Sequence, residues 1–271
     1  MRQQLSDTSR LEALRKVCRE AGAAILAVYH RPDVVGGAGV STKSDATPLT
    51  EADLAAHHRI VEALGVLDPA TPVVSEEDEA SHAHRVPMGT FWLIDPLDGT
   101  KEFIARNGEF TVNIALVRDG VAVLGAVFAP VTDELFLGGP GMGSVRERSG
   151  QRQAVSVARA RPGQAMRVVA SKSHMTEETR AYLARLGEHS LVQAGSSLKF
   201  CRVAEGSADA YPRIGPTAEW DTAAAQAVLE GAGGVVHDLH GRPLRYGKAI
   251  NRNEGFVASA WTLPPVQGSG A

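Results

Sequence analysis

Four acidic segments of this chain have residue types and positions that suit divalent-metal chemistry. They are Asp53, the run EEDE at residues 76–79, the pair Asp95 and Asp98, and the pair Glu219 and Asp221. Three of the four lie at the end of a predicted apolar strand or at the start of a predicted helix, where side chains can converge. Hard cations such as Mg²⁺ prefer oxygen ligands, commonly one or two carboxylates each with phosphate oxygens and water. Two such ions about 4 Å apart would need bridging carboxylates.

The segment WLIDPLDGT, residues 92–100, has the most specific pattern of these. Three apolar residues precede its two carboxylates, and Pro96 between them fixes the chain direction and cannot donate a ladder hydrogen bond. Gly99 allows the backbone to approach an anion closely. Thr100 adds a hydroxyl at the start of a predicted helical turn, where free N–H groups favour phosphate. The segment therefore suits both a metal ion and a phosphate.

Each acidic segment also has an ordinary structural explanation when it is taken alone. An Asp-Pro or Asp-Gly pair usually marks a turn, and a run of acidic residues is usually a solvated loop. Asp221 could cap a helix, and Asp53 could complement the dipole of a helix in its first turn. Metal chemistry is favoured because several carboxylates at predicted strand ends occur together, one of them followed by Gly-Thr.

The elements that must position these residues in the first half of the chain follow from hydrophobic spacing. Helices are predicted over residues 9–29 and 50–64, and Thr50 is expected to be an N-cap with Asp53 placed as in a capping box. Short strands are predicted at residues 72–74 and 91–94. An antiparallel meander is predicted at residues 111–117, 121–129 and 134–137, with a hairpin tip in GGPGMG at 138–143.

After about residue 150, short apolar strands alternate with helical stretches, which favours an α/β unit. Strands are predicted at residues 167–170, 191–194, 208–211 and 234–237, and helices at about 175–186, 197–205 and 220–231. We therefore expect an α/β (α+β) protein in two halves. Residues 1–155 form a larger α+β half with most of the metal ligands, residues 156–262 form a smaller α/β half, and residues 263–271 form a flexible tail.

Composition and charge narrow the class of function. Of the 271 residues, 44% are hydrophobic and 22% are charged, as in an ordinary globular domain. The net charge of −3 does not favour nucleic acid or a polybasic membrane surface. Cys18 and Cys201 are far apart and form no CxxC pair, so we expect a reducing, cytoplasmic setting. No apolar segment approaches the roughly 20 residues that span a bilayer, and residues 1–20 lack a secretory apolar core, which leaves only peripheral attachment to the inner face of the membrane.

Two other patterns do not support a site of their own. The stretch GGAGVSTKS at residues 36–44 is not a P-loop, because Thr42 stands where that motif requires glycine before Lys43. An alternative is that Lys43 reaches the acidic site from a loop. The histidines at positions 57, 58, 82 and 84 lack the spacing of a Zn²⁺ site.

Three segments, in this order and at long spacings, resemble the signature segments of the inositol monophosphatase superfamily of Mg²⁺-dependent, Li⁺-sensitive phosphatases. They are SEED at 75–78, WLIDPLDGT at 92–100, and EWDTAA at 219–224 with EGAGG at 230–234. The resemblance covers nearly the whole chain and implies the layered αβαβα sugar-phosphatase fold, with the active site between the two halves. Residues 101–117, 195–213 and 215–224 further resemble the 3′(2′),5′-bisphosphate nucleotidase branch.

That branch implies a reaction and its alternatives. Its members remove the 3′-phosphate of adenosine 3′,5′-bisphosphate (PAP) to give AMP and phosphate, and some convert the sulfated form, PAPS, to adenosine 5′-phosphosulfate, in sulfur assimilation and PAP clearance. A metal-activated water attacks in line. Two or three Mg²⁺ ions are implied, with Mn²⁺ substituting and Li⁺ and Ca²⁺ inhibiting, in a monomer or homodimer. The alternatives are an inositol monophosphatase or sugar bisphosphatase on the same scaffold, and a non-catalytic metal- and nucleotide-binding protein.

The resemblance also implies roles for single residues. The metal ligands are Glu76, Asp95, Asp98, Asp221 and the backbone carbonyl of Leu97. The catalytic residues that orient the attacking water are Asp53, Thr100 and Glu76. The substrate-binding residues are Gly99, Thr100, His174, Ser196, Lys199, Arg213 and Asp221. Lys199 and Arg213 supply the charge that a second phosphate needs and that an inositol monophosphate would not require. One departure is Ala225, where the family commonly has glycine; the loop at residues 80–88 is also poorly matched.

Overall fold

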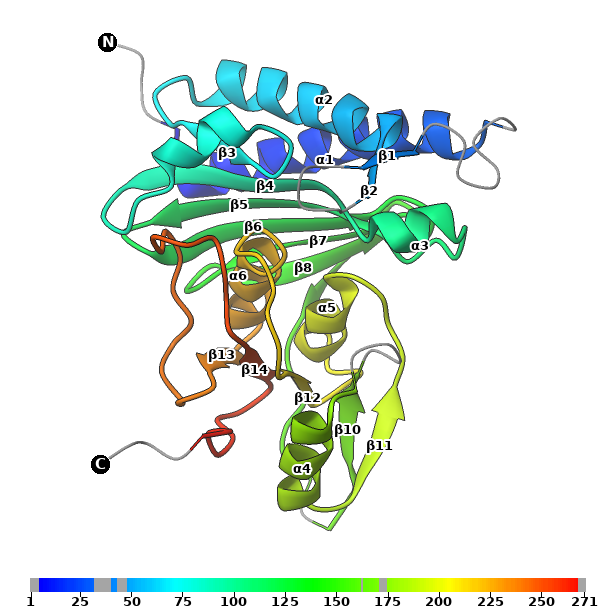
Figure 1. The fold of residues 1–271 in the computed structure, drawn as a ribbon, viewed down its shortest axis with the longest axis vertical. Coiled ribbons are helices and arrows are strands. Elements are labelled where there is room, and N and C mark those ends of the chain that lie inside the picture. The colour runs from blue at the N-terminus through cyan, green and yellow to red at the C-terminus, as the bar shows by residue number, and fades with distance from the viewer. Residues whose placement is uncertain (1–4, 32–39, 43–47, 162, 171–174, 268–271) are drawn as a thin grey trace.

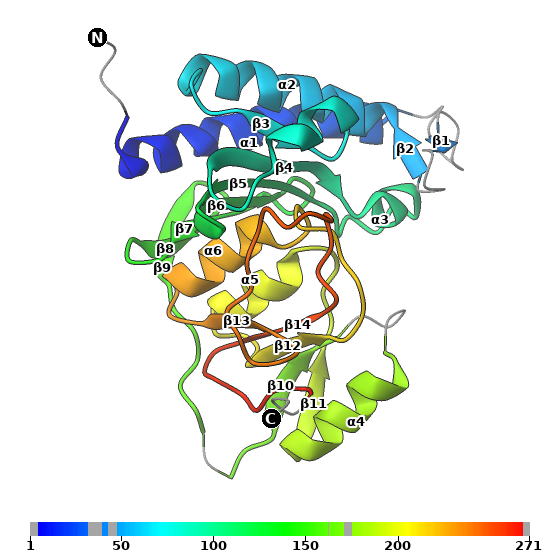
Figure 2. The ribbon, with the colours of Figure 1, turned by 60° about the vertical axis from the view of Figure 1, so that its left-hand side comes forward.

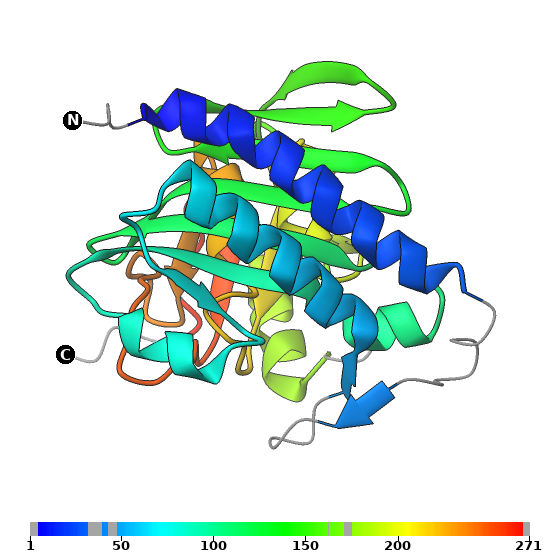
Figure 3. The ribbon, with the colours of Figure 1, turned by 90° about the horizontal axis from the view of Figure 1, so that it is seen from above.

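The structure is a computed structural model that describes residues 5–31, 40–42, 48–161, 163–170 and 175–267. Helices and sheets alternate in layers, with helices outside each of two large sheets and between them (Figure 1). The helices α1 (Asp7–Tyr29) and α2 (Glu51–Leu67) lie side by side across the outer face of the first sheet (Figure 3). This arrangement confirms the expected layered α/β fold.

The first sheet has seven strands, and their order in space is their order in the chain. Their bounds are β3 (Val73–Ser75), β4 (Thr90–Asp98), β5 (Thr111–Arg118), β6 (Val121–Ala129), β7 (Glu134–Gly139), β8 (Gly143–Arg148) and β9 (Gln151–Val155). The strand β3 is parallel to β4, and every later pair is antiparallel. The predicted meander and the hairpin tip between β7 and β8 are therefore confirmed, while β8 and β9 extend the sheet beyond the prediction.

The strand β4 departs from the sequence-based expectation at the acidic corner. We expected the strand to end at Ile94, but its bounds include both carboxylates. The register with β5 shifts between Asp95 and Asp98, and pairing resumes where Asp98 faces Thr111. Because Pro96 has no N–H to donate, the ladder is interrupted rather than ended. Such a bulge re-aims the side chains on either side of it.

The second sheet has five strands in the order β11-β10-β12-β14-β13. Their bounds are β10 (Met166–Val169), β11 (His189–Val192), β12 (Ala210–Arg213), β13 (Val235–Asp238) and β14 (Phe256–Ser259). The strand β10 is parallel to β11 and β12, whereas β14 is antiparallel to both of its neighbours. The helix α4 (Glu177–Leu186) covers its outer face (Figures 1 and 2). The four predicted strands are present near their expected places, and β14 was missed.

Two helices, α5 (Leu198–Ala204) and α6 (Ala223–Gly231), lie between the sheets (Figure 2). The absence of a side chain on Gly125 of β6 lets α6 approach the first sheet closely, because a Cβ placed there would lie 2.0 Å from the backbone oxygen of Ala224. Ala225 of the same helix is fully buried, so the methyl group that departs from the family pattern is accommodated. The close approach fixes the loop before α6, which carries Asp221.

The C-terminal tail is anchored rather than loose as far as the structure describes it. Tyr182 donates its hydroxyl hydrogen to the carbonyl of Pro264, at 2.8 Å between the oxygens, and the N–H of Gln267 donates to Leu239 at 2.9 Å. The tail therefore closes over the outer helix α4 and one end of the second sheet. None of the helices in the described ranges has the combined length and apolarity that crossing a bilayer requires.

Candidate active site

Four of the predicted metal-ligating carboxylates lie close enough to repel one another. Glu76 directly follows β3, and its N–H donates to Ile94 of the parallel neighbour β4 at 3.2 Å. Burial, and then repulsion from Glu76 and Asp98, raises the pKa of Asp95 well above its usual range. The pKa of Asp221 is also raised well above its usual range, first by burial and then by Asp98 and Glu76. The fold therefore brings the first two motifs and the third to one place.

These groups fit a hard divalent cation. All of the predicted side-chain ligands are carboxylates, which suit Mg²⁺ or Mn²⁺ better than Zn²⁺, and their buried negative charge needs a counter-charge. Lys199 partly offsets burial at Asp98 and holds its raised pKa lower than burial alone would. Within the described residues, no three acidic, histidine or cysteine side chains are already placed as a set that could hold a metal ion.

Two of the histidines considered for zinc support the end of β3. The Nδ1 atom of His57 is 2.8 Å from Oγ of Ser75, and Nε2 of His82 is 2.9 Å from the carbonyl oxygen of the same serine. The ring of His82 also lies 5.2 Å, centroid to centroid, from that of Trp220. These contacts hold the loop that carries Glu76 against the loop that carries Asp221.

Asp53 caps a helix and also contacts another of the predicted site residues. The capping box is confirmed, because the N–H of Thr50 donates to Oδ2 of Asp53 at 2.8 Å and the Thr50 side chain accepts from the helix. Its other oxygen, Oδ1, accepts a hydrogen bond of 3.4 Å from the hydroxyl of Thr100. Thr100 is the first residue of α3 (Thr100–Ile104). The cap thus fixes the carboxylate in an orientation that faces Thr100.

The corner between Asp98 and Thr100 requires glycine. Gly99 has φ of 96°, in the left-handed region, and a Cβ there would lie 2.2 Å from Oγ of Ser196. That hydroxyl oxygen is 2.9 Å from the carbonyl of Asp98 and 2.8 Å from the carbonyl of Glu109. Ser196 therefore supports the corner from the second half of the chain, and its predicted contact with a nucleotide stays a prediction.

A cavity of about 150 Å³ adjoins the carboxylates and has opposite charges on its walls. It is lined by Asp98, Gly99, Glu102, Ser196, Lys199, Phe200, Tyr211, Arg213, Thr217, Asp221, Thr222 and Phe256. Lys199 is buried, donates from Nζ to the carbonyl of Ser196 at 3.1 Å, and lies over the ring of Tyr211. Burial lowers the pKa of Lys199, and Asp98 opposes that change.

Arg213 is the second cation of this cavity, and part of its guanidinium is unused. It donates to the carbonyl of Pro216 at 3.3 Å, whereas its buried Nε atom has no partner among the described residues. An anion between Lys199 and Arg213 would relieve the repulsion of two neighbouring positive charges. Two residues considered from the sequence, His174 and Lys43, lie outside the described residues.

Three polar residues around Asp98 were not singled out from the sequence. Thr111 and Asn113 point from β5 toward Asp98, and Ser197 reaches it from the turn before α5. The sequence did contain a signal for Thr111 and Asn113, because two polar residues at alternate positions of a mostly apolar strand share one face. In the structure these two side chains are buried, at 0% and 1% exposure. The position of Ser197 gave no comparable signal.

Glu219 was grouped with Asp221 in the sequence, but it faces another environment. Its side chain is fully buried and forms ion pairs with Lys248 at 2.7 Å and with Arg85 at 3.4 Å. It also accepts a hydrogen bond of 2.8 Å from the N–H of Gly247. Glu219 therefore locks the loop that carries Asp221, and the structure does not bring it to the carboxylate cluster.

Replacing Glu219 by alanine should destabilise the protein by about 3–5 kcal/mol, because Arg85 would be left buried without its charge partner. Denaturant unfolding measures this loss. The matched control is Glu254→Ala, which breaks an exposed pair with Arg252 and should cost at most about 1 kcal/mol. Equal losses in the two variants would contradict a locking role for Glu219.

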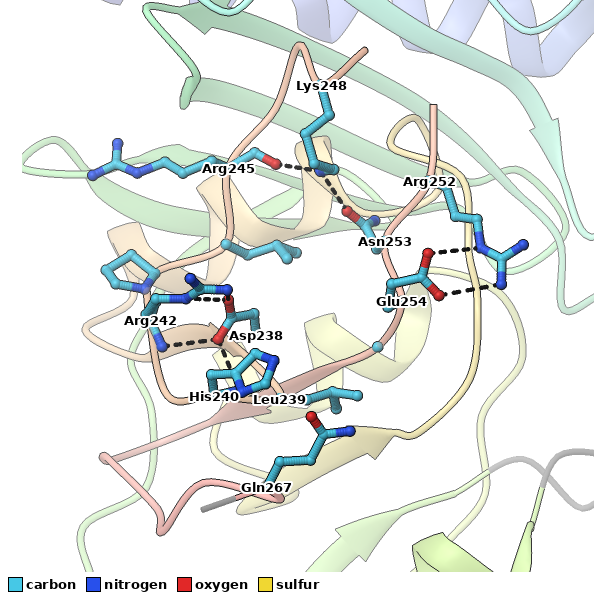
Figure 4. A pocket seen from close by; sticks show the side chains of 13 residues that line it. Asp238, Leu239, His240, Arg242, Arg245, Lys248, Arg252, Asn253, Glu254 and Gln267 are labelled. Atoms are coloured by element: carbon cyan, nitrogen blue, oxygen red, sulfur yellow. Dashed lines mark hydrogen bonds and ion pairs between the residues drawn. The ribbon is translucent and has the colours of Figure 1, made fainter. Parts of the chain in front are cut away.

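A larger hollow on the second half carries no comparable chemistry. It encloses about 840 Å³, but four of its charged side chains form two ion pairs with one another (Figure 4). Arg242 pairs with Asp238 and Arg252 with Glu254, and the side chain of Arg245 extends away from the other labelled groups. None of the predicted site residues that the structure describes lines it. The smaller cavity is the better candidate because its charges face a shared space.

Comparison with known proteins assigns the chain to a family. The inositol monophosphatase family model matches residues 7–266. A 3′(2′),5′-bisphosphate nucleotidase CysQ from Escherichia coli (strain K12) is 48% identical over 236 residues, which are 87% of this chain and 93% of the relative. The CysQ of Buchnera aphidicola subsp. Acyrthosiphon pisum (strain APS) is 39% identical over 253 residues, 92% and 93% of the two chains. The crystal structure of CysQ from Bacteroides thetaiotaomicron superposes with a TM-score of 0.82 at 40% identity, covering 94% of this chain and 98% of that one. The chain belongs to the inositol monophosphatase family.

Proposed function

We propose that this protein is a Mg²⁺-dependent 3′(2′),5′-bisphosphate nucleotidase that hydrolyses the 3′-phosphate of PAP to give AMP and phosphate. The observation that carries the proposal is one cavity with Asp98 and Asp221 on its wall together with Lys199 and Arg213. A substrate with two phosphates needs a site with carboxylates that hold metal ions near one phosphate and with positively charged side chains near the other. The names of the similar CysQ proteins support the same substrate class.

The proposed metal ligands are the side chains of Glu76, Asp95, Asp98 and Asp221 and the carbonyl of Leu97. They would hold two or three Mg²⁺ ions, with Mn²⁺ as a substitute and Li⁺ and Ca²⁺ as inhibitors. When bound, Mg²⁺ neutralises phosphoryl oxygens and lowers the pKa of water. The N–H of Leu97 donates to Oδ1 of Asp95 at 3.0 Å, which restrains that carboxylate within the corner.

Asp53 and Thr100 orient the attacking water in this proposal, with help from Glu76. The hydroxyl hydrogen of Thr100 is directed to Oδ1 of Asp53, so its oxygen is left to accept a hydrogen bond from water. A water that donates a hydrogen bond to Thr100 keeps a lone pair that can attack phosphorus. The carboxylate of Asp53 is the local base that can take up the proton released along this contact.

The substrate is proposed to lie across the cavity. The N–H groups of Gly99 and Thr100 receive the 3′-phosphate beside Asp221, and Lys199 and Arg213 neutralise the 5′-phosphate. Ser196 and His174 are assigned to the nucleoside by the resemblance of their motifs. On the same grounds we place the enzyme in the cytoplasm as a monomer or homodimer, in PAP clearance during sulfur assimilation, with PAPS as a second substrate.

A substrate panel tests this function directly. Phosphate release is measured with Mg²⁺ on PAP, PAPS, inositol 1-phosphate and fructose 1,6-bisphosphate at equal concentrations. PAP should have the highest kcat/KM, and Li⁺ should inhibit its hydrolysis. Faster hydrolysis of inositol 1-phosphate would favour an inositol monophosphatase instead, and faster hydrolysis of fructose 1,6-bisphosphate would favour a sugar bisphosphatase. Tight binding of PAP without release of phosphate would show a non-catalytic binding protein.

A further inference from the structure

One oxygen of Asp98 is surrounded by donors from the protein. Oδ2 lies 3.0 Å from the hydroxyl oxygen of Ser197, 3.4 Å from that of Thr111, and 3.5 Å from Nδ2 of Asn113. Within the described residues, no hydrogen bond to Oδ1 is formed. The two oxygens of this carboxylate therefore have different surroundings, one engaged by the protein and one available to a ligand.

Ser197 also connects the two halves of the chain at this point. Its hydroxyl oxygen is 2.9 Å from the backbone carbonyl of Asp221 and accepts a hydrogen bond of 2.9 Å from Asn113. A hydroxyl has one hydrogen and two lone pairs. The Asn113 donor occupies a lone pair, so the single hydrogen of Ser197 lies between the Asp98 carboxylate and the Asp221 carbonyl.

The burial of these three polar side chains indicates that they do more than fill space. Ser197, Asn113 and Thr111 are 2%, 1% and 0% exposed, and burying polar side chains costs free energy unless their hydrogen bonds are satisfied. An apolar set of similar size would fill the same volume without that cost. The polar set fixes the direction of the Asp98 carboxylate and the distance between Asp98 and the loop that carries Asp221. Groups that hydrogen-bond to a metal-ligating carboxylate act in this way.

We propose that Ser197, supported by Asn113 and Thr111, is a positioning residue that engages Oδ2 of Asp98, leaves Oδ1 to face a divalent cation, and sets the position of the Asp221 loop relative to Asp98. The inference rests on the proposed function, because it takes Asp98 and Asp221 as cation ligands. It concerns cation affinity rather than the chemical step, since Ser197 acts only through its two neighbours.

The test is a titration of the full-length protein with Mn²⁺ alone, in which free Mn²⁺ is followed by electron paramagnetic resonance. Ser197→Ala should weaken Mn²⁺ binding by roughly 10- to 100-fold. Asn113→Ala should also weaken Mn²⁺ binding. The double variant should lose less than the product of the two single effects, because both residues act through one chain of hydrogen bonds.

Ser259→Ala is the matched control. That serine is 1% exposed and donates to the carbonyl of Trp261 at 2.7 Å, so its substitution also removes a buried hydroxyl. It should leave Mn²⁺ affinity unchanged. Thermal unfolding of each variant without cation shows whether the fold is retained. Equal Mn²⁺ affinity in Ser197→Ala and wild type, or equal weakening in Ser197→Ala and Ser259→Ala, would overturn the positioning role.

Asp98→Asn separates this inference from the function on which it rests. If Asp98→Asn loses Mn²⁺ binding while Ser197→Ala keeps it, the positioning role is wrong and the metal site stands. If Asp98→Asn binds Mn²⁺ as the wild type does, the assignment of the metal site is wrong and the positioning role falls with it.

Discussion

Asp98→Asn should lower kcat/KM for Mg²⁺-dependent hydrolysis of PAP by on the order of 10³-fold or more. Asp98 lies at the β4 bulge, faces Thr111 across the strand pair, and is coupled electrostatically to Glu76 and Asp221. The amide of asparagine has nearly the same shape but no charge, so it is a much weaker partner for a hard cation. Its oxygen can still accept from Ser197, and the local hydrogen bonds can therefore remain.

The same variant should keep its fold, and its metal-free stability should depend less on pH. Burial raises the pKa of Asp98 in the folded state, so the folded protein binds the proton more tightly than the unfolded chain does. Such a group contributes stability that is present at low pH and is lost as pH rises through the raised pKa. Asparagine does not ionise, so Asp98→Asn removes this contribution. Thermal unfolding in a chelator, at mildly acidic and at neutral pH, measures the difference.

Asp238→Asn is the control for this experiment. Asp238 pairs with Arg242 in the larger hollow of the second half, away from the predicted ligands. Its substitution is chemically the same and should leave hydrolysis of PAP near the wild-type rate. Substantial activity in Asp98→Asn would contradict the assigned metal site, and a loss of both activity and folded structure would show that the charge is needed for folding.

Lys199→Ala should reduce the preference for PAP over 3′-AMP, which lacks the 5′-phosphate. A hydrogen bond to a charged group contributes about 1.5–3 kcal/mol, or roughly 10- to 100-fold in kcat/KM at about 1.4 kcal/mol for each factor of ten. Wild type should therefore hydrolyse PAP much faster than 3′-AMP, and the variant should lose most of that ratio. The two substrates are compared because Lys199 also faces Asp98. An effect through the metal site would slow the hydrolysis of PAP and of 3′-AMP alike, and would leave their ratio unchanged.

Two further variants complete this comparison. Arg213→Ala should reduce the same ratio, because its side chain lines the cavity with Lys199. Arg180→Ala, which removes an exposed cation that pairs with Glu177 on the outer helix α4, should leave the ratio unchanged. Equal rates of the wild type on PAP and 3′-AMP would argue against a nucleotidase that recognises two phosphates.

Much of the candidate site could be predicted from local sequence because the chemistry requires particular residue types in short segments. Glu76, Asp95, Asp98 and Asp221 belong to recognisable motifs, and the structure brings their charges together. The capping box was predictable for a related reason: its donors and acceptors come from residues three apart in the chain.

Strand ends and irregular loops were harder to predict. The β4 bulge keeps the acidic corner within the sheet, although Pro96 and Gly99 are signals that usually end a strand. Pairing across the bulge with β5 stabilises this conformation, and that partner strand is not part of the local pattern. The strand β14 was missed because its short apolar run has no periodicity that separates it from a buried loop.

By itself the sequence determined which residue types are present, the order of the motifs, and the alternation of helices and strands that makes the layered fold. Only the tertiary structure decided where neighbouring side chains point. Glu219 and Asp221 are two residues apart, yet one is held by Arg85 and Lys248 and the other lies in the carboxylate cluster. Ser197 reaches Asp98 from almost a hundred positions away. The physical reason is that side-chain direction in a loop without regular periodicity depends on contacts with distant segments.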